Sequence, residues 1–241
     1  SEAVQESGLT PNAVSKALRQ AAKDGRIVRL KEYVFVIVPL EYRAAGAPPP
    51  SWFIHNLMTA MDLPYYVGLL SAASLHGASY QQPLVFQVMT DRSVRPILAG
   101  RTKIHFSASK YVRQAAVKEL KTPTGLMRVS TPETTVFDLV RFAKVAGHLD
   151  HVSGLIAELA PSLDLKRLIA AVNAVGDIPN TQRLGYILER VRQKRIADAL
   201  HEWVRPQIQR KQLLRPGQPA DGATENRRWM LLINSPLEVE S

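Results

Sequence analysis

A helix with clear signals at both ends, followed directly by a hairpin pattern, constrains the fold more than any other feature of this sequence. Thr10 is a typical N-cap, Pro11 suits the first helical position, and Gly25 is placed to end the helix. The next residues, 27–30 and 33–38, are β-branched and aromatic runs separated by two charged residues. We therefore predict a helix over 11–24 and a two-stranded hairpin behind it.

Residues 1–7 predict a shorter helix, joined to the first by a glycine-containing turn at 8–10. Helix, turn, helix and hairpin in this order are typical of a winged helix-turn-helix, whose second helix enters the major groove of DNA. The helix that normally precedes this pair is absent from the numbered sequence, which does not begin with methionine. Either a shortened sequence or the loss of that segment from the protein would explain its absence.

The helix over 11–24 separates an apolar stripe from a polar, basic face. Between residues 11 and 31, six Lys and Arg residues stand against a single acid, Asp24, for a net charge of +5, half of the +10 carried by the whole chain. Such a concentration of positive charge attracts nucleic acid. We predict that this region binds DNA through Thr10, Asn12, Ser15, Lys16, Arg19, Lys23, Arg26, Arg29 and Lys31.

The side-chain types divide these residues into two roles. Asn12 and Arg19 can form bidentate bonds with the edges of adenine and guanine, and Ser15 is a softer candidate for the same role. The other six, Thr10 and the five remaining basic residues, are better suited to hold phosphates. The alternative is that each of them is only a solvated surface side chain. A position on a basic helix does not by itself show that the side chain reaches DNA.

A proline-rich stretch, Ala-Ala-Gly-Ala-Pro-Pro-Pro at 44–50, predicts a semi-rigid connection. We divide the chain there into a winged helix-turn-helix domain over 1–40, a linker over 41–51 and a larger domain over 52–241. The fold class is α+β, in which the winged helix is followed by a larger mixed domain with a small sheet and then a helical region.

Within the larger domain, the apolar periodicity predicts both helices and strands. The helices are expected over 52–61, 65–76, from the Thr131 N-cap onward, and over 149–159, 165–175, 183–191 and 196–204. The strands are expected over 84–90, 96–99, 103–107, 117–122 and 126–129. Residues 215–228 read as a mobile loop, and 229–233 as a final strand.

The chain lacks the residues that several classes of function require. The chain contains no cysteine, which excludes disulfides, thiolate nucleophiles and cysteine-based metal sites. It also lacks phosphate-binding glycine motifs and a G-x-S-x-G elbow, and no apolar run approaches the roughly 18 residues of a membrane span. We therefore expect a cytoplasmic protein without enzymatic activity, cofactor, metal or membrane contact.

Four stretches of the chain resemble the AbiEi family of type IV antitoxins. They are Gly-Leu-Thr-Pro at 8–11 with its helix, YYVGLLSAASLHG at 65–77, VSTPETTVFDLV at 129–140 and Arg-Leu-Gly-Tyr at 183–186. The resemblance implies an amino-terminal winged helix and a larger antitoxin domain. It implies a repressor that binds inverted repeats in the double-stranded operator DNA of its own operon. It also implies an antitoxin that counteracts a nucleotidyltransferase toxin of the AbiEii type, without requiring that the two proteins bind each other.

Two other functions stay open at this point. The larger domain could sense a small molecule in a pocket lined by aromatic residues, although these side chains fit a core equally well: Trp52, Tyr65, Tyr66 and His76. A magnesium-dependent nuclease could use Asp91 together with Glu119 and Lys121, which project from one face of a predicted strand.

Basic residues of the larger domain could add a second contact with nucleic acid or face only water: Arg92, Arg95, Arg101, Lys103, Lys110 and Arg113. His148 and His151, three residues apart, would suit a metal only if further ligands joined them.

Overall fold

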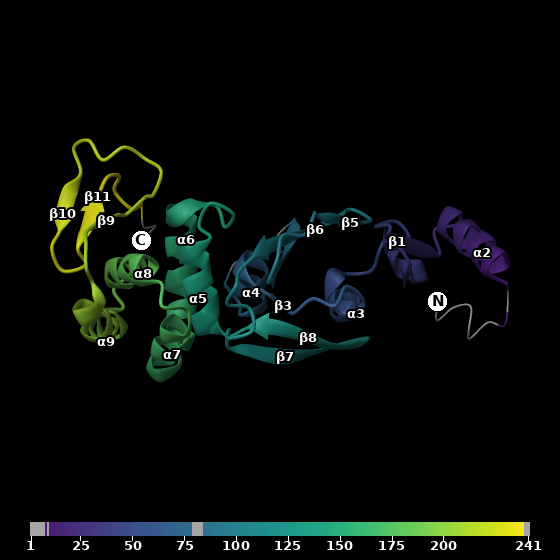
Figure 1. Ribbon diagram of the computed structural model, residues 1–241, viewed down its shortest axis with the longest axis horizontal. Helices are drawn as coiled ribbons and strands as arrows, with labels where there is room; N and C mark the ends of the chain where they lie inside the picture. The colour runs from purple at the N-terminus through teal and green to yellow at the C-terminus, as the bar shows by residue number, and fades with distance from the viewer. Residues whose placement is uncertain (1–7, 9, 79–83, 239–241) are drawn as a thin grey trace.

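The computed structural model describes residues 8, 10–78 and 84–238. The molecule is elongated, with helix α2 (Pro11–Lys23) at one end and a small sheet at the other (Figure 1). Between these ends lie a hairpin, a six-stranded mixed sheet and a group of helices, so the fold class is α+β. The helix predicted over 1–7 lies outside the described residues.

Helix α2 has the end signals that the sequence predicts. The Thr10 hydroxyl accepts a hydrogen bond from the amide of Ala13 at 3.4 Å, and proline occupies the first turn. After the C-cap Asp24, Gly25 takes a φ of +66°, which lets the chain turn sharply towards the hairpin. The helix therefore ends one residue earlier than predicted.

The hairpin consists of antiparallel strands β1 (Ile27–Lys31) and β2 (Val34–Ile37). Leu30 is buried, and it belongs with Val28, Val34 and Val36 to a core cluster that continues into the large sheet. Strand alternation puts the neighbouring residues of β1 on the opposite face. The hairpin therefore packs one face against the rest of the molecule and leaves the other for solvent.

The proline-rich segment lies against the sheet. Short 3-10 helices at Leu40–Tyr42 and Pro50–Trp52 flank it, and Ala47 within it is buried. The amide of Arg101 donates to the carbonyl of Ala45 at 3.0 Å, and a Cβ on Gly100 would lie 2.2 Å from that carbonyl oxygen. Backbone contacts therefore hold this segment, which the sequence predicts to be a semi-rigid polyproline connection. The division into domains stays a prediction.

The large sheet has the strand order β5-β6-β4-β3-β8-β7. The pairs β4/β6 and β3/β8 are parallel, and the remaining neighbours are antiparallel. Its strands are β3 (Tyr65–Val67), β4 (Val85–Thr90), β5 (Ile97–Ala99), β6 (Thr102–Ala108), β7 (Val117–Thr122) and β8 (Gly125–Ser130).

The single helix predicted over 65–76 is wrong, because this stretch is a strand followed by a helix. β3 occupies the interior of the sheet and all three of its residues are buried, so its sequence shows no polar alternation. Gly68 is extended, and a Cβ there would lie 2.7 Å from the Met89 side chain. Helix α4 (Leu69–Leu75) begins only after this close approach.

Six further helices and a small sheet complete the larger part of the chain among the residues that the structure describes. The helices are α3 (Ile54–Ala60), α5 (Pro132–Arg141), α6 (His148–Leu159), α7 (Leu165–Val175), α8 (Ile178–Arg190) and α9 (Lys194–Val204). Helix α8 begins five residues before the predicted start at 183, because Asp177 accepts the amide of Asn180 as an N-cap. Strand β11 (Leu231–Ile233) is the final strand, somewhat shorter than predicted.

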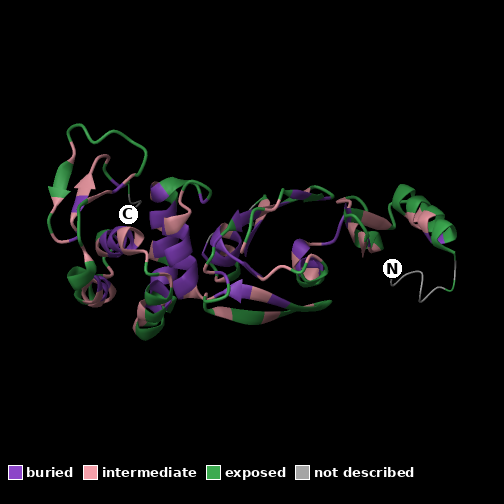
Figure 2. Cartoon of the chain, viewed as in Figure 1, coloured by how far each residue is buried: buried purple, intermediate pink, exposed green. Residues whose placement is uncertain are grey.

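The prediction of a mobile loop over 215–228 is wrong in part. Strand β10 (Thr224–Asn226) lies within it and joins β11 and β9 (Gln212–Leu213) in a three-stranded sheet. Arg215 is also fixed, because its guanidinium donates to Asp150 at 2.6 Å and its amide to Asn234 at 3.0 Å. Residues 216–222 are irregular and exposed, and β10 is largely exposed as well, as the green colour in Figure 2 shows.

Two core clusters hold the molecule together. One joins the hairpin, α3 and one face of the large sheet, and the other joins the opposite face to α5–α9 and the small sheet. Figure 2 shows α5 buried along almost its whole length at the centre of the second cluster. Across the described residues, none of the helices combines the length and the apolar character needed to cross a membrane.

Candidate nucleic-acid interface

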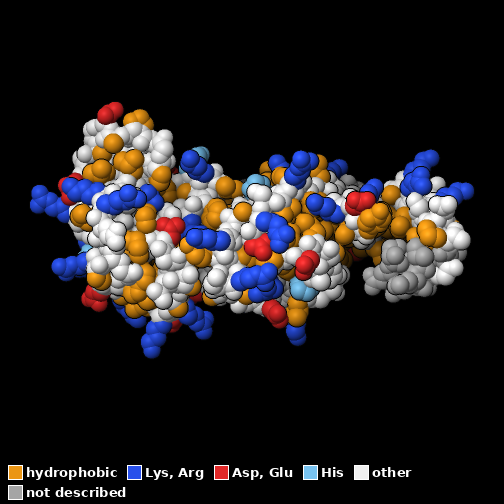
Figure 3. All heavy atoms as spheres, viewed as in Figure 1, with side chains coloured by type: hydrophobic (Ala, Val, Ile, Leu, Met, Phe, Trp, Pro, Cys, Tyr) orange, Lys and Arg blue, Asp and Glu red, His pale blue; other side chains and the backbone are white. Residues whose placement is uncertain are grey.

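Helix α2 presents nearly all of its predicted contact residues to solvent. Asn12, Lys16, Arg19 and Lys23 are exposed and Ser15 is half-buried, whereas Val14 on the opposite side is buried. Helical periodicity therefore separates a face that packs from a face that is free to bind. In Figure 3, Lys and Arg side chains project from this end of the molecule.

Arg19 lies against its own helix. Its guanidinium donates to the Ser15 hydroxyl at 3.1 Å and to the Ser15 carbonyl at 3.4 Å. Both bonds are exposed, so a base edge can replace them at little cost in free energy. Ser15 thus orients the side chain that has the best chemistry for guanine.

Asp24 offsets part of the positive charge at the end of α2. Its carboxylate accepts from Gln20 at 2.8 Å and forms an ion pair with Arg26 at 2.9 Å. Within the described part of the chain, Lys16 and Lys23 form no ion pair. The charge of these two lysines is therefore available to a polyanion.

On the hairpin, Arg29 and Lys31 are exposed on the face that does not pack on the sheet. Arg29 donates to the carbonyl of Lys31 at 3.3 Å, which holds its side chain along the strand. The tip is tight, and Tyr33 there has a φ of +63° and is 80% exposed. Helix α2 contacts β1, so the basic residues of both elements lie at the same end of the molecule.

The aromatic pocket considered for a small-molecule sensor is not formed. Tyr65 and Tyr66 are both buried, but neighbouring residues of a strand point to opposite faces, and the two rings belong to different core clusters. His76 bonds to the carbonyl of Ser130 at 2.7 Å, and burial lowers its pKa. These side chains serve packing.

The residues considered for a nuclease are kept apart. Asp91 follows β4 whereas Glu119 lies on β7, and strands β3 and β8 separate the two. Asp91 forms ion pairs with Arg92 at 3.1 Å and Arg113 at 3.8 Å. Among residues 8, 10–78 and 84–238, no three His, Asp or Glu side chains are grouped so that they could hold a metal ion, and this includes the pair His148 and His151.

Of the basic residues considered for a second nucleic-acid contact, Arg92 and Arg113 are therefore partly neutralised by Asp91. Lys110 lies over the Tyr111 ring at 5.0 Å. Arg95, Arg101 and Lys103 are not in an ion pair with any described residue.

The motif residues of the larger part form a buried polar network. The Tyr66 hydroxyl donates to the Asp138 carboxylate at 2.6 Å, and Arg141 donates to the same carboxylate at 2.9 Å. Burial raises the pKa of Asp138, and burial together with the neighbouring carboxylate raises the pKa of Tyr66. The network ties β3 to α5 across the second core cluster.

One basic pocket was not predicted from the sequence. It has a volume of about 540 Å³ and lies between the end of α5, the start of α6, helix α8 and the segment after β9. Its Lys and Arg residues, Arg141, Lys144, Arg183 and Arg215, come from three separate stretches of sequence. Arg183 lies in the motif at 183–186, but no sequence pattern joins it to the other three basic residues.

The comparisons with known proteins agree with this architecture. The fold resembles the crystal structure of the RV2827C protein from Mycobacterium tuberculosis, with a TM-score of 0.65 and 14% sequence identity over 91% of this chain and 79% of that one. No curated protein matches the chain. The profile described as the AbiEi antitoxin C-terminal domain matches residues 66–190, which is 125 of the 241 residues. The chain therefore belongs to the AbiEi antitoxin family.

Proposed function

We propose that this protein is an antitoxin that counteracts a nucleotidyltransferase toxin of the AbiEii type and represses its own operon by binding operator DNA. The observation that carries the DNA-binding part is the exposed basic face of α2 beside a hairpin whose outer face is also basic. A helix of this kind fits the major groove, and a hairpin beside it reaches the flanking backbone.

In this proposal, Asn12 and Arg19 read base edges and Ser15 keeps Arg19 in place until it binds. Phosphates are held by Thr10, Lys16, Lys23, Arg26, Arg29 and Lys31. Arg26 must share its charge with Asp24, so it contributes less than the lysines. Two molecules would occupy the two halves of an inverted repeat.

The antitoxin part of the proposal rests on the family to which residues 66–190 belong. It requires that growth inhibition by the toxin disappears on co-expression, and it does not require a stable complex of the two proteins.

Gel shifts with operator DNA at two salt concentrations test the DNA-binding part. Arg19→Ala is expected to weaken operator binding by about 1–3 kcal/mol and to relax sequence preference, because it removes a base contact. Lys23→Ala is expected to weaken binding to all duplexes alike and to reduce the salt dependence, because it removes a phosphate contact.

The exposed Lys166 on α7 supplies a matched control, since Lys166→Ala removes the same charge far along the chain from α2 and should leave operator binding unchanged. Unchanged operator affinity in the double variant Lys16→Ala, Arg19→Ala would show that α2 is not the recognition helix.

A further inference from the structure

The basic pocket between α5, α6 and α8 has an unusual charge balance. Four of its fourteen lining residues are Lys or Arg, and none of the fourteen is acidic. Two of the four cations have carboxylate partners behind the pocket wall: Arg215 pairs with Asp150 at 2.6 Å, and Arg141 pairs with Asp138 at 2.9 Å. The other two cations are Lys144 and Arg183, and the structure has to explain why their positive charges lie on this pocket.

Arg183 is only 6% exposed and, among the described residues, has no carboxylate within ion-pair distance. Its guanidinium donates to two neutral oxygens, the Leu213 carbonyl at 2.9 and 3.0 Å and the Asn180 side chain at 2.8 Å. These bonds use three of its five N–H groups, which leaves one on each terminal nitrogen. The charge of Asp177 acts on Arg183 from beyond Asn180, whose amide donates to that carboxylate at 2.8 Å, so no described anion contacts the buried guanidinium directly.

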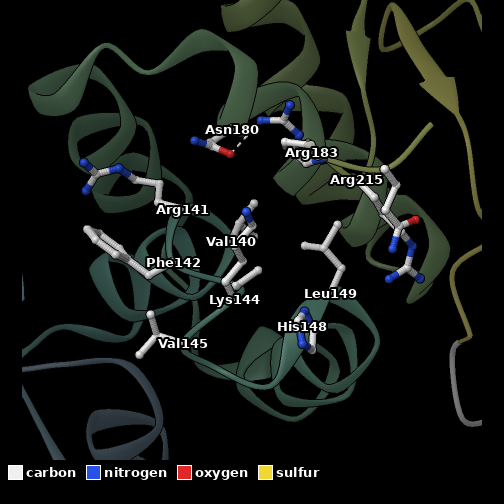
Figure 4. A pocket seen from close by; sticks show the side chains of 14 residues that line it. Val140, Arg141, Phe142, Lys144, Val145, His148, Leu149, Asn180, Arg183 and Arg215 are labelled. Atoms are coloured by element: carbon white, nitrogen blue, oxygen red, sulfur yellow. Dashed lines mark hydrogen bonds between the residues drawn. The ribbon is translucent and has the colours of Figure 1, made fainter. Parts of the chain in front are cut away.

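Lys144 supplies the complementary feature, an exposed cation on the same pocket. It lies in the turn between α5 and α6, and it forms no ion pair with any residue that the structure describes. Figure 4 shows Lys144, Arg183 and Arg215 around one hollow, with Asn180 holding Arg183 in place. An anion there would reach a fixed guanidinium and a flexible ammonium together.

One part of the wall is apolar, whereas His148 and Gln218 add polar groups elsewhere, and the pocket has the size of a small molecule. Val140, Phe142, Val145 and Leu149 line the apolar part, and about 540 Å³ lies within the range of ordinary ligand pockets. We propose that this pocket binds a phosphorylated small molecule of nucleotide size, its phosphates on Arg183 and Lys144 and its apolar part against this wall. The proposal is independent of DNA binding and of the action on a toxin.

Isothermal titration calorimetry of the full chain tests the proposal. The probes are inorganic pyrophosphate and the four nucleoside triphosphates, each triphosphate compared with its own nucleoside. We expect pyrophosphate to bind at one site per chain, at least one triphosphate to bind more tightly, and the nucleosides not to bind. Lys144→Ala should weaken binding about tenfold, the effect of losing one charge-assisted hydrogen bond.

Arg183→Gln should weaken binding further, but it also removes the bonds to Leu213, so its thermal unfolding must be compared with that of the parent chain. Lys144 has no such structural role. Lys166→Ala and Arg19→Ala are controls for general charge and for binding at α2, and both should leave pyrophosphate affinity within twofold.

The proposal is overturned if neither pyrophosphate nor any triphosphate binds the parent chain. It is also overturned if Lys166→Ala or Arg19→Ala weakens binding as much as Lys144→Ala does, because the phosphates would then sit elsewhere on the basic surface.

Discussion

Gly185 shows how a single missing methyl group sets the packing of α8. A Cβ at this position would lie 2.1 Å from the ring of Trp229, which is fully buried. The indole is fixed on its other sides, because its Nε1 donates to Glu189 at 2.5 Å and the His201 ring packs edge-on at 5.2 Å. The ring therefore has no free direction in which to move.

We expect Gly185→Ala to lower the free energy of unfolding by about 1–3 kcal/mol, because overpacking outweighs the gain in helix propensity. Urea unfolding of the two chains measures this. Gly154 on α6 is the matched control, since a Cβ there meets nothing within 4 Å. Gly154→Ala should be neutral or should raise stability by up to about 1 kcal/mol. Equal effects at the two glycines would contradict the packing argument.

At the scale of helices and strands, the sequence predicts best those segments whose ends have typical capping residues. The caps at Thr10 and Thr131 both have the predicted geometry, with each hydroxyl accepting the amide three residues on. The predicted start of α8 at 183 is late, because Asp177 and the Pro179 and Asn180 that follow it are residue types that also favour turns. β3 was missed because three buried residues of an interior strand have the same apolar character as the turn of a helix.

The two candidate binding sites also differ in how far the sequence predicts them. The basic face of α2 follows from local periodicity, so its residues could be named from the sequence. The basic pocket could not, because Lys144, Arg183 and Arg215 meet only when α5, α8 and the segment after β9 have packed together. No pattern within any one segment indicates that neighbourhood.

The contact of the proline-rich segment with the sheet leads to a prediction about Gly100. This residue has a φ of +55°, and a Cβ on it would collide with backbone atoms of residues 45–47. We expect Gly100→Ala to displace that segment and to make the exposed Arg43 a faster site of trypsin cleavage, followed by mass spectrometry of the fragments.

Gly222→Ala is the control for this experiment. Gly222 also has a positive φ, +69°, but a Cβ there would meet nothing within 4 Å. The backbone strain of the two substitutions is therefore similar, and only the collision differs. If Arg43 is cut at the same rate in both variants, the segment is not held by this contact.

At the scale of the whole molecule, the two proposed activities are far apart. Helix α2 lies at one end, while most of residues 66–190 lie beyond the hairpin and α3 (Figure 1). The full chain with Lys16→Ala and Arg19→Ala should therefore lose operator binding and still relieve growth inhibition by its partner toxin. Growth assays with co-expressed toxin, beside gel shifts, measure the two separately. Loss of both activities in a normally folded variant would contradict this division.

A substitution variant of the 241-residue chain is preferable to a truncation at residue 51, because the hairpin is part of the core. Leu30 is buried in the cluster that contains Phe53, Ile97 and Ile104. Removing residues 1–50 would expose this apolar surface, so a failure of the truncated chain would not separate lost function from lost stability.

The adjacent tyrosines of β3 make the sheet sensitive to an error of register. Tyr65 turns its hydroxyl towards His55 and the Arg128 amide, whereas Tyr66 turns to Asp138 on the opposite side. Slipping β3 by one residue would put either Val67 in the place of Tyr66, so that the buried Asp138 loses its phenol donor, or Pro64 in the place of Tyr65, so that His55 and the Arg128 amide lose their partner. A chain in which β3 paired in the wrong register would therefore be less stable. The two hydroxyls thus favour the correct register as well as stabilising the folded protein.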